Sequence, residues 1–239
     1  MTVLCIETST SVCSAAICKD SALIKQCINK EGSNHARLLP RYIEELLALA
    51  REQSLCIDAV ALSEGPGSYT GLRIGASTAK GLCCGLNIPL IPVPTLKVLC
   101  EAVKSNTHHR VQSTDLLCPM IDARRMEVYT SVMMNGEWVN GEGAKAVVVE
   151  NEESVLCQRS GLSFVSETVY YFGDGAAKCQ SVFTQPNWHY IPDIVPEAQY
   201  MGILVESGKR KVESVDLAYY EPFYLKEFIA AQSHVKGLV

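Results

Sequence analysis

The sequence lacks CxxC spacings, any run of ~18 apolar residues, and all but a few aromatic residues, which make up 7% of the chain. Without a long apolar run, no segment is predicted to cross a membrane. The first residues, MTVLCIETST, lack the basic region and cleavable apolar core of a secretory signal. The 11 cysteines are odd in number and scattered, as is typical of buried thiols in a reducing compartment. We therefore expect a cytoplasmic protein.

An excess of positive charge is also missing, since the formal net charge is −5. Affinity for nucleic acid comes largely from clustered Lys and Arg, so this chain is not expected to bind RNA by itself. Any RNA would be reached only through a basic partner. The 239 residues, 48% of them hydrophobic, are enough for one large core or two modest lobes.

Apolar runs in the first half predict alternating strands and helices. The runs at 3–7, 12–18 and 22–29 predict an antiparallel meander. Leu39, Ile43 and Leu46 then recur at helical spacing. Pro40 predicts that this helix starts late or bends after a first turn capped by Ser33 or Asn34. A strand at 57–62, a helix at 72–86, a strand at 88–93 and a helix at 94–103 follow.

The same order begins again after the polar stretch at 105–114. Strands are predicted at 116–121, 126–134, from 137 and at 168–172, with helices at 152–159, from 176 and at 196–207. We therefore predict an α/β fold of two duplicated βββαβα lobes, 1–104 and 105–239, facing one another across a cleft. This is the architecture of actin-like ATPases and sugar kinases (the ASKHA, ribonuclease H-like class).

The loop EGPGSYTGLRIG at 64–75 fails the P-loop pattern because no lysine follows its last glycine. Two readings stay open. An anion would fit the helix start, where amides point outward. Alternatively, Gly65, Pro66, Gly67 and Gly71 provide a sharp strand-to-helix turn.

The turn after the first strand carries a carboxylate, Glu7, but no glycine that would let backbone amides approach a phosphate. Glu7, Thr8 and Ser9 are candidates for a nucleotide site, although a hairpin that satisfies its own backbone is favoured. Asp122 and Arg124 form either a charged turn or a cleft or partner contact. Asp174 in GDGA is a further cleft candidate, although a glycine-flanked aspartate is more often a turn residue.

The histidines of the sequence are not spaced so that two of them could bind one metal ion from the same helix face. One turn after His35 stands Leu39, so no second imidazole shares that helix face. His108, His109, His189 and His234 also lack ligand partners at helical spacing. We predict no metal site, and we expect His35 to be a capping or surface residue.

Several motifs then add up to a family. GPGSYTGLRIGASTAKGL, together with IETSTSVCSAAI, NHARLLPRYIEELL, IDARRMEVY, GDGA and PFYLKE, closely resembles the TsaB (YeaZ) family over nearly the whole chain. The resemblance implies an actin-like fold and a role in making threonylcarbamoyladenosine from adenosine 37 of tRNA. In that family's system, the catalytic subunit TsaD holds a metal through an HxxxH pair, and TsaE is a small ATPase. In this sequence, His35 matches the first histidine of that pair, and Leu39 stands where the second histidine would be.

The resemblance therefore implies a non-catalytic subunit without metalloprotease chemistry. It pairs with a TsaD-type subunit or a second copy of itself, and with a TsaE-type ATPase, while tRNA is reached only through the complex. No cofactor is expected for the chain alone, and ATP or ADP at the joint interface is left open. The helices implied to form the interface carry His35, Leu39, Ile43, Leu46, Leu72, Arg73, Gly75, Ala76, Ala79 and Lys80. The alternative is a self-sufficient actin-like kinase or ATPase that uses Glu7 and Asp122.

Overall fold

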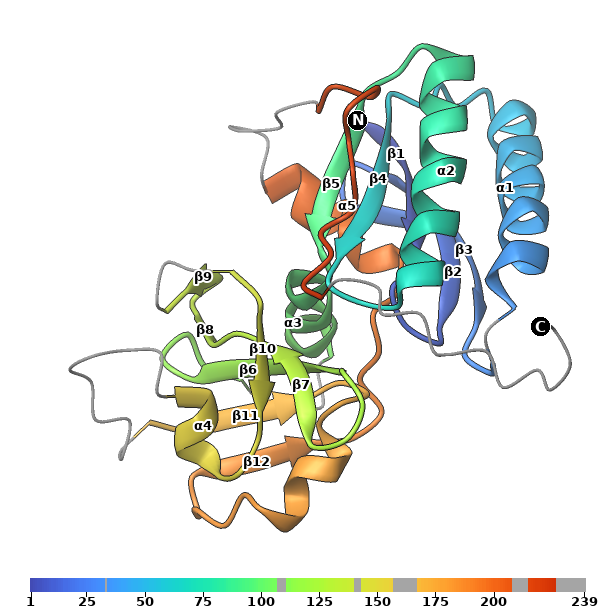
Figure 1. Ribbon diagram of the computed structural model, residues 1–239. Coiled ribbons are helices and arrows are strands. Elements are labelled where there is room, and N and C mark those ends of the chain that lie inside the picture. Colours follow the sequence, from blue (N-terminus) through green and yellow to red (C-terminus); the bar gives the residue numbers. More distant parts are fainter. Residues whose placement is uncertain (33, 107–110, 140–142, 157–166, 208–214, 227–239) are drawn as a thin grey trace, which may run out of the picture.

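The computed structural model describes residues 1–32, 34–106, 111–139, 143–156, 167–207 and 215–226 (Figure 1). Predictions for Ser33, His108, His109 and His234 lie outside the described residues. The helices are α1 (His35–Glu52), α2 (Tyr69–Leu86), α3 (Thr95–Ser105), α4 (Glu152–Leu156), α5 (Gln199–Ser207) and the short 3-10 helix η1 (Ala177–Ser181).

The strands fall into two sheets. The first holds β1 (Thr2–Glu7), β2 (Cys13–Lys19), β3 (Ala22–Asn29), β4 (Ala59–Gly65) and β5 (Leu90–Pro94). The second holds β6 (Leu116–Asp122), β7 (Glu127–Thr130), β8 (Met133–Met134), β9 (Glu137–Trp138), β10 (Lys145–Val148), β11 (Val169–Phe172) and β12 (Trp188–Ile191).

The first sheet has the order β3-β2-β1-β4-β5. Strands β1 to β3 form the predicted antiparallel meander, while β4 pairs in parallel with β1, and β5 in parallel with β4. Helices α1 and α2 lie side by side on one face, and α5 covers the other (Figure 1). The carboxyl ends of the parallel strands β1 and β4 therefore meet at one edge, where the turn after Glu7 and the glycine loop also lie.

The second sheet repeats this topology. Its order is β10-β7-β6-β11-β12, with antiparallel β6–β7 and β7–β10 pairs and parallel β6–β11 and β11–β12 pairs, while β8 and β9 form a side ladder. The predicted duplication and the α/β fold are confirmed. Strand β12 was not predicted, the predicted strand at 126–134 is divided into β7 and β8, and the helix expected from Ala176 is only the short η1.

Helix α1 packs through its apolar stripe. Leu39, Ile43 and Leu46 are buried against the sheet together with Ala76 and Ala79 of α2. The alternative of a late start after Pro40 was wrong, because α1 begins at His35 and runs through Pro40 to Glu52; the bend at Pro40 stays a prediction. Asn34 is the N-cap residue, but its side chain makes no capping hydrogen bond.

Two segments that follow the second sheet return to the first. Met201 and Val205 of α5 pack on the sheet face opposite α1 and α2, whereas the sequence placed residues 105–239 in the second lobe. The last described residues, 216–226, form what we call the C-terminal strap. It runs beside α2, and Tyr220 belongs to the same core as α1 and α2 (Figure 1). None of the described helices is long and apolar enough to cross a membrane.

Candidate functional site

The glycine loop is packed directly on the turn that follows β1. An added Cβ would lie 2.2 Å from the Ser9 carbonyl oxygen at Gly67, 2.0 Å from the Thr8 carbonyl oxygen at Gly71, and 2.3 Å from Thr8 Oγ1 at Gly75. Contacts this short leave no room for any side chain. Of the two interpretations of the loop, these contacts support the one in which its glycines allow a sharp turn from strand to helix.

The start of α2 is also occupied by internal hydrogen bonds. The Ser68 amide donates to the Ser9 carbonyl at 2.6 Å, the Leu72 amide to the Ser68 carbonyl at 2.8 Å, and the Gly71 amide to Ser68 Oγ at 3.4 Å. A helix start binds anions through free amides. The amides of Ser68, Gly71 and Leu72 already have partners, so they are not available to a phosphate.

Glu7, Thr8 and Ser9, the candidates for a nucleotide site, are fully buried. Ser9 donates to Glu7 Oε1 through its amide at 2.6 Å and its hydroxyl at 2.5 Å, and Thr8 Oγ1 donates to the Gly71 carbonyl at 2.9 Å. Burial raises the pKa of Glu7, and the hydrogen bonds from Ser9 oppose this shift. The turn pairs Thr8 and Ser9 internally, as the favoured interpretation of the sequence predicted, but Glu7 Oε2 is buried without a hydrogen-bond partner among the described residues.

His35 is not at the surface. Its side chain is buried, and Nε2 lies 3.1 Å from the Val12 carbonyl oxygen. A carbonyl only accepts, so this bond assigns the ring proton to Nε2. Leu39, one turn later, is fully buried in the core. The expectation of a capping or surface histidine was wrong, because the first turn of α1 faces Val12, the residue directly before β2.

The helix residues implied to bind a partner are mostly turned inward. Buried against the sheet are His35, Leu39, Ile43, Leu46, Leu72, Gly75, Ala76 and Ala79. Arg73 is exposed and Lys80 is half-buried. The regular apolar spacing that singled out these helices marks the face that each lays on its own sheet.

The surface available to another molecule is therefore the opposite side of the two helices. We call it the outer face, formed by the exposed residues Arg37, Arg41, Glu44, Ala48, Thr70, Ser77, Gly81 and Cys84. An added Cβ at Gly81 would meet nothing within 4 Å. The small residues Ala48, Ser77 and Gly81 would let a facing helix approach closely. Sequence reasoning missed this set because its polar and small residues carry no periodic signal.

The second-lobe candidates do come together. The Asp122 amide donates to Asp174 Oδ1 at 3.0 Å, the Arg124 amide donates to Asp122 Oδ1 at 3.1 Å, and Lys178 pairs with Asp122. Gly175 lies against Ile121 at the end of β6. Of the two alternatives that the sequence left open for Asp122 and Arg124, these contacts favour the charged turn. Among the described residues, no group of three or more His, Cys, Asp and Glu side chains is placed to hold a metal ion.

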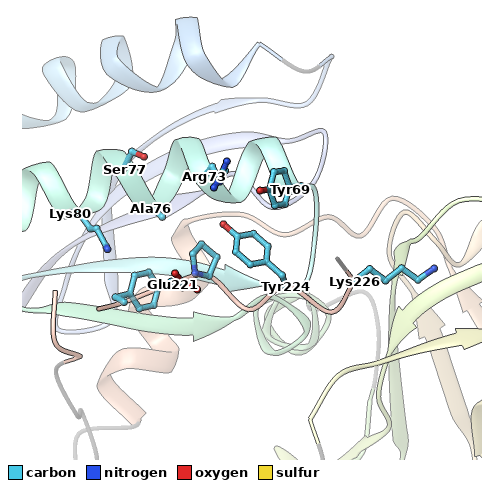
Figure 2. A pocket seen from close by; sticks show the side chains of 10 residues that line it. Tyr69, Arg73, Ala76, Ser77, Lys80, Glu221, Tyr224 and Lys226 are labelled. Carbon is cyan, nitrogen blue, oxygen red and sulfur yellow. The ribbon is translucent and has the colours of Figure 1, made fainter. Parts of the chain in front are cut away.

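A groove that the sequence did not predict lies between α2 and the C-terminal strap (Figure 2). Its cavity volume is about 460 Å³. The Arg73 guanidinium lies 4.8 Å from the centre of the Tyr69 ring, and the Tyr69 and Tyr224 rings are 5.1 Å apart. Lys80 Nζ is 5.9 Å from the Tyr220 ring centre. The groove thus combines cationic and aromatic side chains from segments about 150 residues apart.

The strap is held by contacts on either side of Tyr224. The Phe223 amide donates to the Glu64 carbonyl at 2.7 Å, beside Gly65, where an added Cβ would come within 2.6 Å of the Phe223 carbonyl oxygen. Lys226 forms an ion pair with Glu127 of β7. The strap therefore contacts the glycine loop of the first lobe and the sheet of the second.

Two sheets of the same topology, with helices on the first and a packed turn at the end of its first strand, define an actin-like α/β protein. The solved structure described as YeaZ from Pseudomonas aeruginosa has this fold, with a TM-score of 0.72 and 23% identity over 94% of this chain and 99% of that one. A Pseudomonas aeruginosa protein described as similar to peptidase YEAZ gives a TM-score of 0.75, also at 23% identity, over 94% of this chain and 99% of its own.

The family model for TsaD, tRNA N6-adenosine threonylcarbamoyltransferase, matches residues 26–230, and the chain belongs to this family. Its curated relatives include several TsaB proteins, which confirms the TsaB (YeaZ) resemblance. The tRNA threonylcarbamoyladenosine biosynthesis protein TsaB of Haemophilus influenzae is 29% identical over 95% of this chain and 94% of its own. TsaB of Escherichia coli is 34% identical over 62% of each chain.

Proposed function

We propose that this chain is a non-catalytic, cytoplasmic subunit in the threonylcarbamoylation of adenosine 37 of tRNA. It docks to a metal-holding TsaD-type transferase, and a TsaE-type ATPase joins the pair. The observation that carries the proposal is the packing of Gly71 and Gly75 against Thr8. The turn where an actin-like ATPase needs open backbone amides is here filled by the chain's own helix.

The contacts of α1 also support a non-catalytic role for this chain beside a metal-holding partner. His35 is engaged by the Val12 carbonyl, and the position one turn later is occupied by Leu39 in the core. A metal site needs convergent ligands, and this helix turn offers a single imidazole with a partner of its own. The metal and the transfer chemistry would therefore come from the catalytic partner. A nucleotide, ATP or ADP, would lie at the joint interface, and tRNA would be reached through the complex.

The outer face of α1 and α2 is the proposed docking surface. The parallel helices α1 and α2 can receive a second pair as a four-helix interface, and small residues permit the short end of the usual spacing of about 8 to 10 Å. Gly81 and Ala48 lie on this face. In the absence of the catalytic partner, the same face would join two copies of this chain.

Gly81→Arg tests this proposal because the new side chain would project from α2 without disturbing the monomer, where an added Cβ meets nothing within 4 Å. We expect it to weaken association with the TsaD-type subunit by about 2 kcal/mol or more, roughly thirtyfold, in calorimetric titration. Gly81→Ala should bind as the wild type does.

Gly143→Arg adds the same charge at another glycine with open space around it and serves as the matched control. Unchanged association of Gly81→Arg would exclude this face as the docking surface. Micromolar binding of ATP and magnesium by the isolated chain would instead favour a self-sufficient kinase or ATPase.

A further inference from the structure

The groove between α2 and the C-terminal strap has a cationic wall on the helix side. Figure 2 shows Arg73, Ser77 and Lys80 along α2, with Tyr224 of the strap turned toward Tyr69. We propose that this groove binds an extended acidic segment of the protein that docks on the outer face of α1 and α2. The inference rests on the proposed function for the identity of that protein, the TsaD-type subunit.

The two cations have no partner that neutralises them. Within the described part of the chain, neither Arg73 nor Lys80 takes part in an ion pair or a hydrogen bond. The Arg73 guanidinium lies 4.8 Å from the centre of the Tyr69 ring, and Lys80 Nζ lies 5.9 Å from that of Tyr220. Contact with a ring holds a cation in place without cancelling its charge. Both charges are therefore available to an anion.

The spacing of the cations fits a peptide chain. Arg73 and Lys80 are seven residues apart on α2, or about 10 Å along the helix axis. An extended peptide advances about 3.3 Å per residue, so side chains three residues apart are also separated by about 10 Å. Ser77, between the two cations, is small and leaves room for a backbone. The groove therefore suits a segment in which two residues separate one Asp or Glu from the next.

The groove is continuous with the proposed docking surface. Ser77 belongs to both, because it is exposed on the outer face and also lines the groove. A protein seated on the outer face would bring a neighbouring segment beside Arg73 and Lys80 at high effective concentration. Exposed ion pairs are weak one by one, so an acidic segment gains from being delivered in this way.

Nucleic acid is the other polyanion that two cations attract, and the groove gives its bases no free ring to stack on. Tyr69 and Tyr224 already contact one another, with ring centres 5.1 Å apart, and Tyr220 is buried in the core. Stacking on open aromatic faces is what bases of single-stranded nucleic acid require. Glu221 in the lining and the formal net charge of −5 also oppose a long chain of phosphates. These features favour a short acidic peptide segment.

The test is association of the full chain with the TsaD-type subunit, measured by calorimetric titration at low and at high salt. Arg73→Gln/Lys80→Gln should weaken association about tenfold at ~0.05 M salt, through the loss of two charge contacts. At ~1 M salt, where the Debye length is about 3 Å, the variant and the wild type should bind almost equally. Damage to the fold would instead weaken association at both salt concentrations.

Lys19→Gln/Lys104→Gln is the matched control, since it removes two positive charges from exposed positions outside the groove and the outer face. It should leave association unchanged within about twofold, as expected for surface charges without a partner. Glu221→Gln makes the opposite prediction. It removes the carboxylate that lines the groove, so association should become tighter at low salt.

A second measurement uses a peptide probe on the isolated chain. The acetylated hexapeptide TETTET, with its glutamates three residues apart, should shift the Arg73 side-chain N–H signal in NMR spectra at millimolar concentration. The peptide TQTTQT should leave this signal in place. An oligouridylate that shifts it at lower concentration than TETTET does would overturn the choice of a peptide over a nucleic acid.

Two results would overturn the inference while the proposed function stands: association that Arg73→Gln/Lys80→Gln leaves unchanged, and a loss of affinity that is equal at low and high salt. The reverse outcome is also distinguishable. If the wild-type chain does not associate with the TsaD-type subunit, but TETTET binds and Arg73→Gln/Lys80→Gln abolishes this binding, then the proposed function is wrong and the groove remains a site for acidic peptides.

Discussion

The carbonyl oxygen of Thr8 lies against Gly71, so close that an added Cβ would come within 2.0 Å of it. These two residues belong to segments separated by 62 residues, the turn after β1 and the first turn of α2. Their contact joins the turn and the glycine loop into one packed unit. What resembles a phosphate loop in the sequence is, in the fold, the place where a helix is seated on a strand end.

Gly71→Ala is expected to destabilise the protein by about 3 kcal/mol, because the new methyl group meets backbone atoms that cannot move without displacing the turn. Gly81→Ala, on the same helix but with open space around it, should instead stabilise by about 0.5 to 1 kcal/mol through helix propensity. Urea unfolding of the two variants measures both effects. Changes of the same sign would contradict the packing described for Gly71.

Gly65→Ala should release the C-terminal strap. Gly65 has a φ of +114°, and an added Cβ would lie 2.6 Å from the Phe223 carbonyl oxygen. Both features oppose a side chain at this position, so the strap is expected to detach before the core is affected. Faster hydrogen exchange of the Phe223 amide, with little change in the amides of β1, is the predicted result.

Gly85→Ala is the control for this experiment, since nothing lies within 4 Å of its added Cβ. If the Phe223 amide exchanges at the wild-type rate in Gly65→Ala, the strap is not held by the contact at Gly65.

The order of elements was predictable because it depends on local patterns. The alternating apolar runs located β1 to β5, and the Asn135-Gly136 dipeptide located the turn between β8 and β9. The family motifs added the two-lobed fold. Strand β12 was missed because its residues, Trp188–Ile191, give neither a long apolar run nor a clear alternation.

The site was harder to predict because it depends on which way each helix turns. The sequence identified α1 and α2 correctly but assigned Ala76 and Ala79 to a partner, whereas both pack on the protein's own sheet. Periodicity locates an apolar face without saying what covers it. The groove was beyond sequence reasoning, since Tyr69 and Tyr224 meet only after the strap has returned to the first lobe.

Two substitutions on α2 separate its inner face from its outer face. Ala79→Asp places a carboxylate at a fully buried position and should destabilise by about 3 kcal/mol or more, since a buried charge needs a partner. Ser77→Asp, at an exposed position half a turn away, should change stability by no more than about 0.5 kcal/mol. Thermal unfolding measures both. Equal stability of the two variants would mean that α2 is turned differently on the sheet.

The buried carboxyl of Glu7 gives stability a dependence on pH. Burial raises the folded-state pKa of Glu7 above its usual value of 4.5, so the folded chain holds this proton more tightly than the unfolded chain does. The contribution of Glu7 to stability is therefore fully present below the unfolded-state pKa and is lost as the pH rises through the folded-state pKa. Glu7→Gln removes this titration and keeps an oxygen that can accept from the Ser9 amide.

We therefore expect the free energy of unfolding of Glu7→Gln, measured relative to the wild type in urea, to rise steadily from pH 4.5 towards neutral pH. The other titrating groups are common to both proteins and cancel in the difference. Ser9→Ala is the companion variant: it removes the hydroxyl that stabilises the charged carboxylate, and should extend the pH-dependent loss of stability to higher pH. A difference between Glu7→Gln and wild type that stays constant with pH would show that Glu7 is charged in the folded protein, with the hydrogen bonds from Ser9 outweighing its burial.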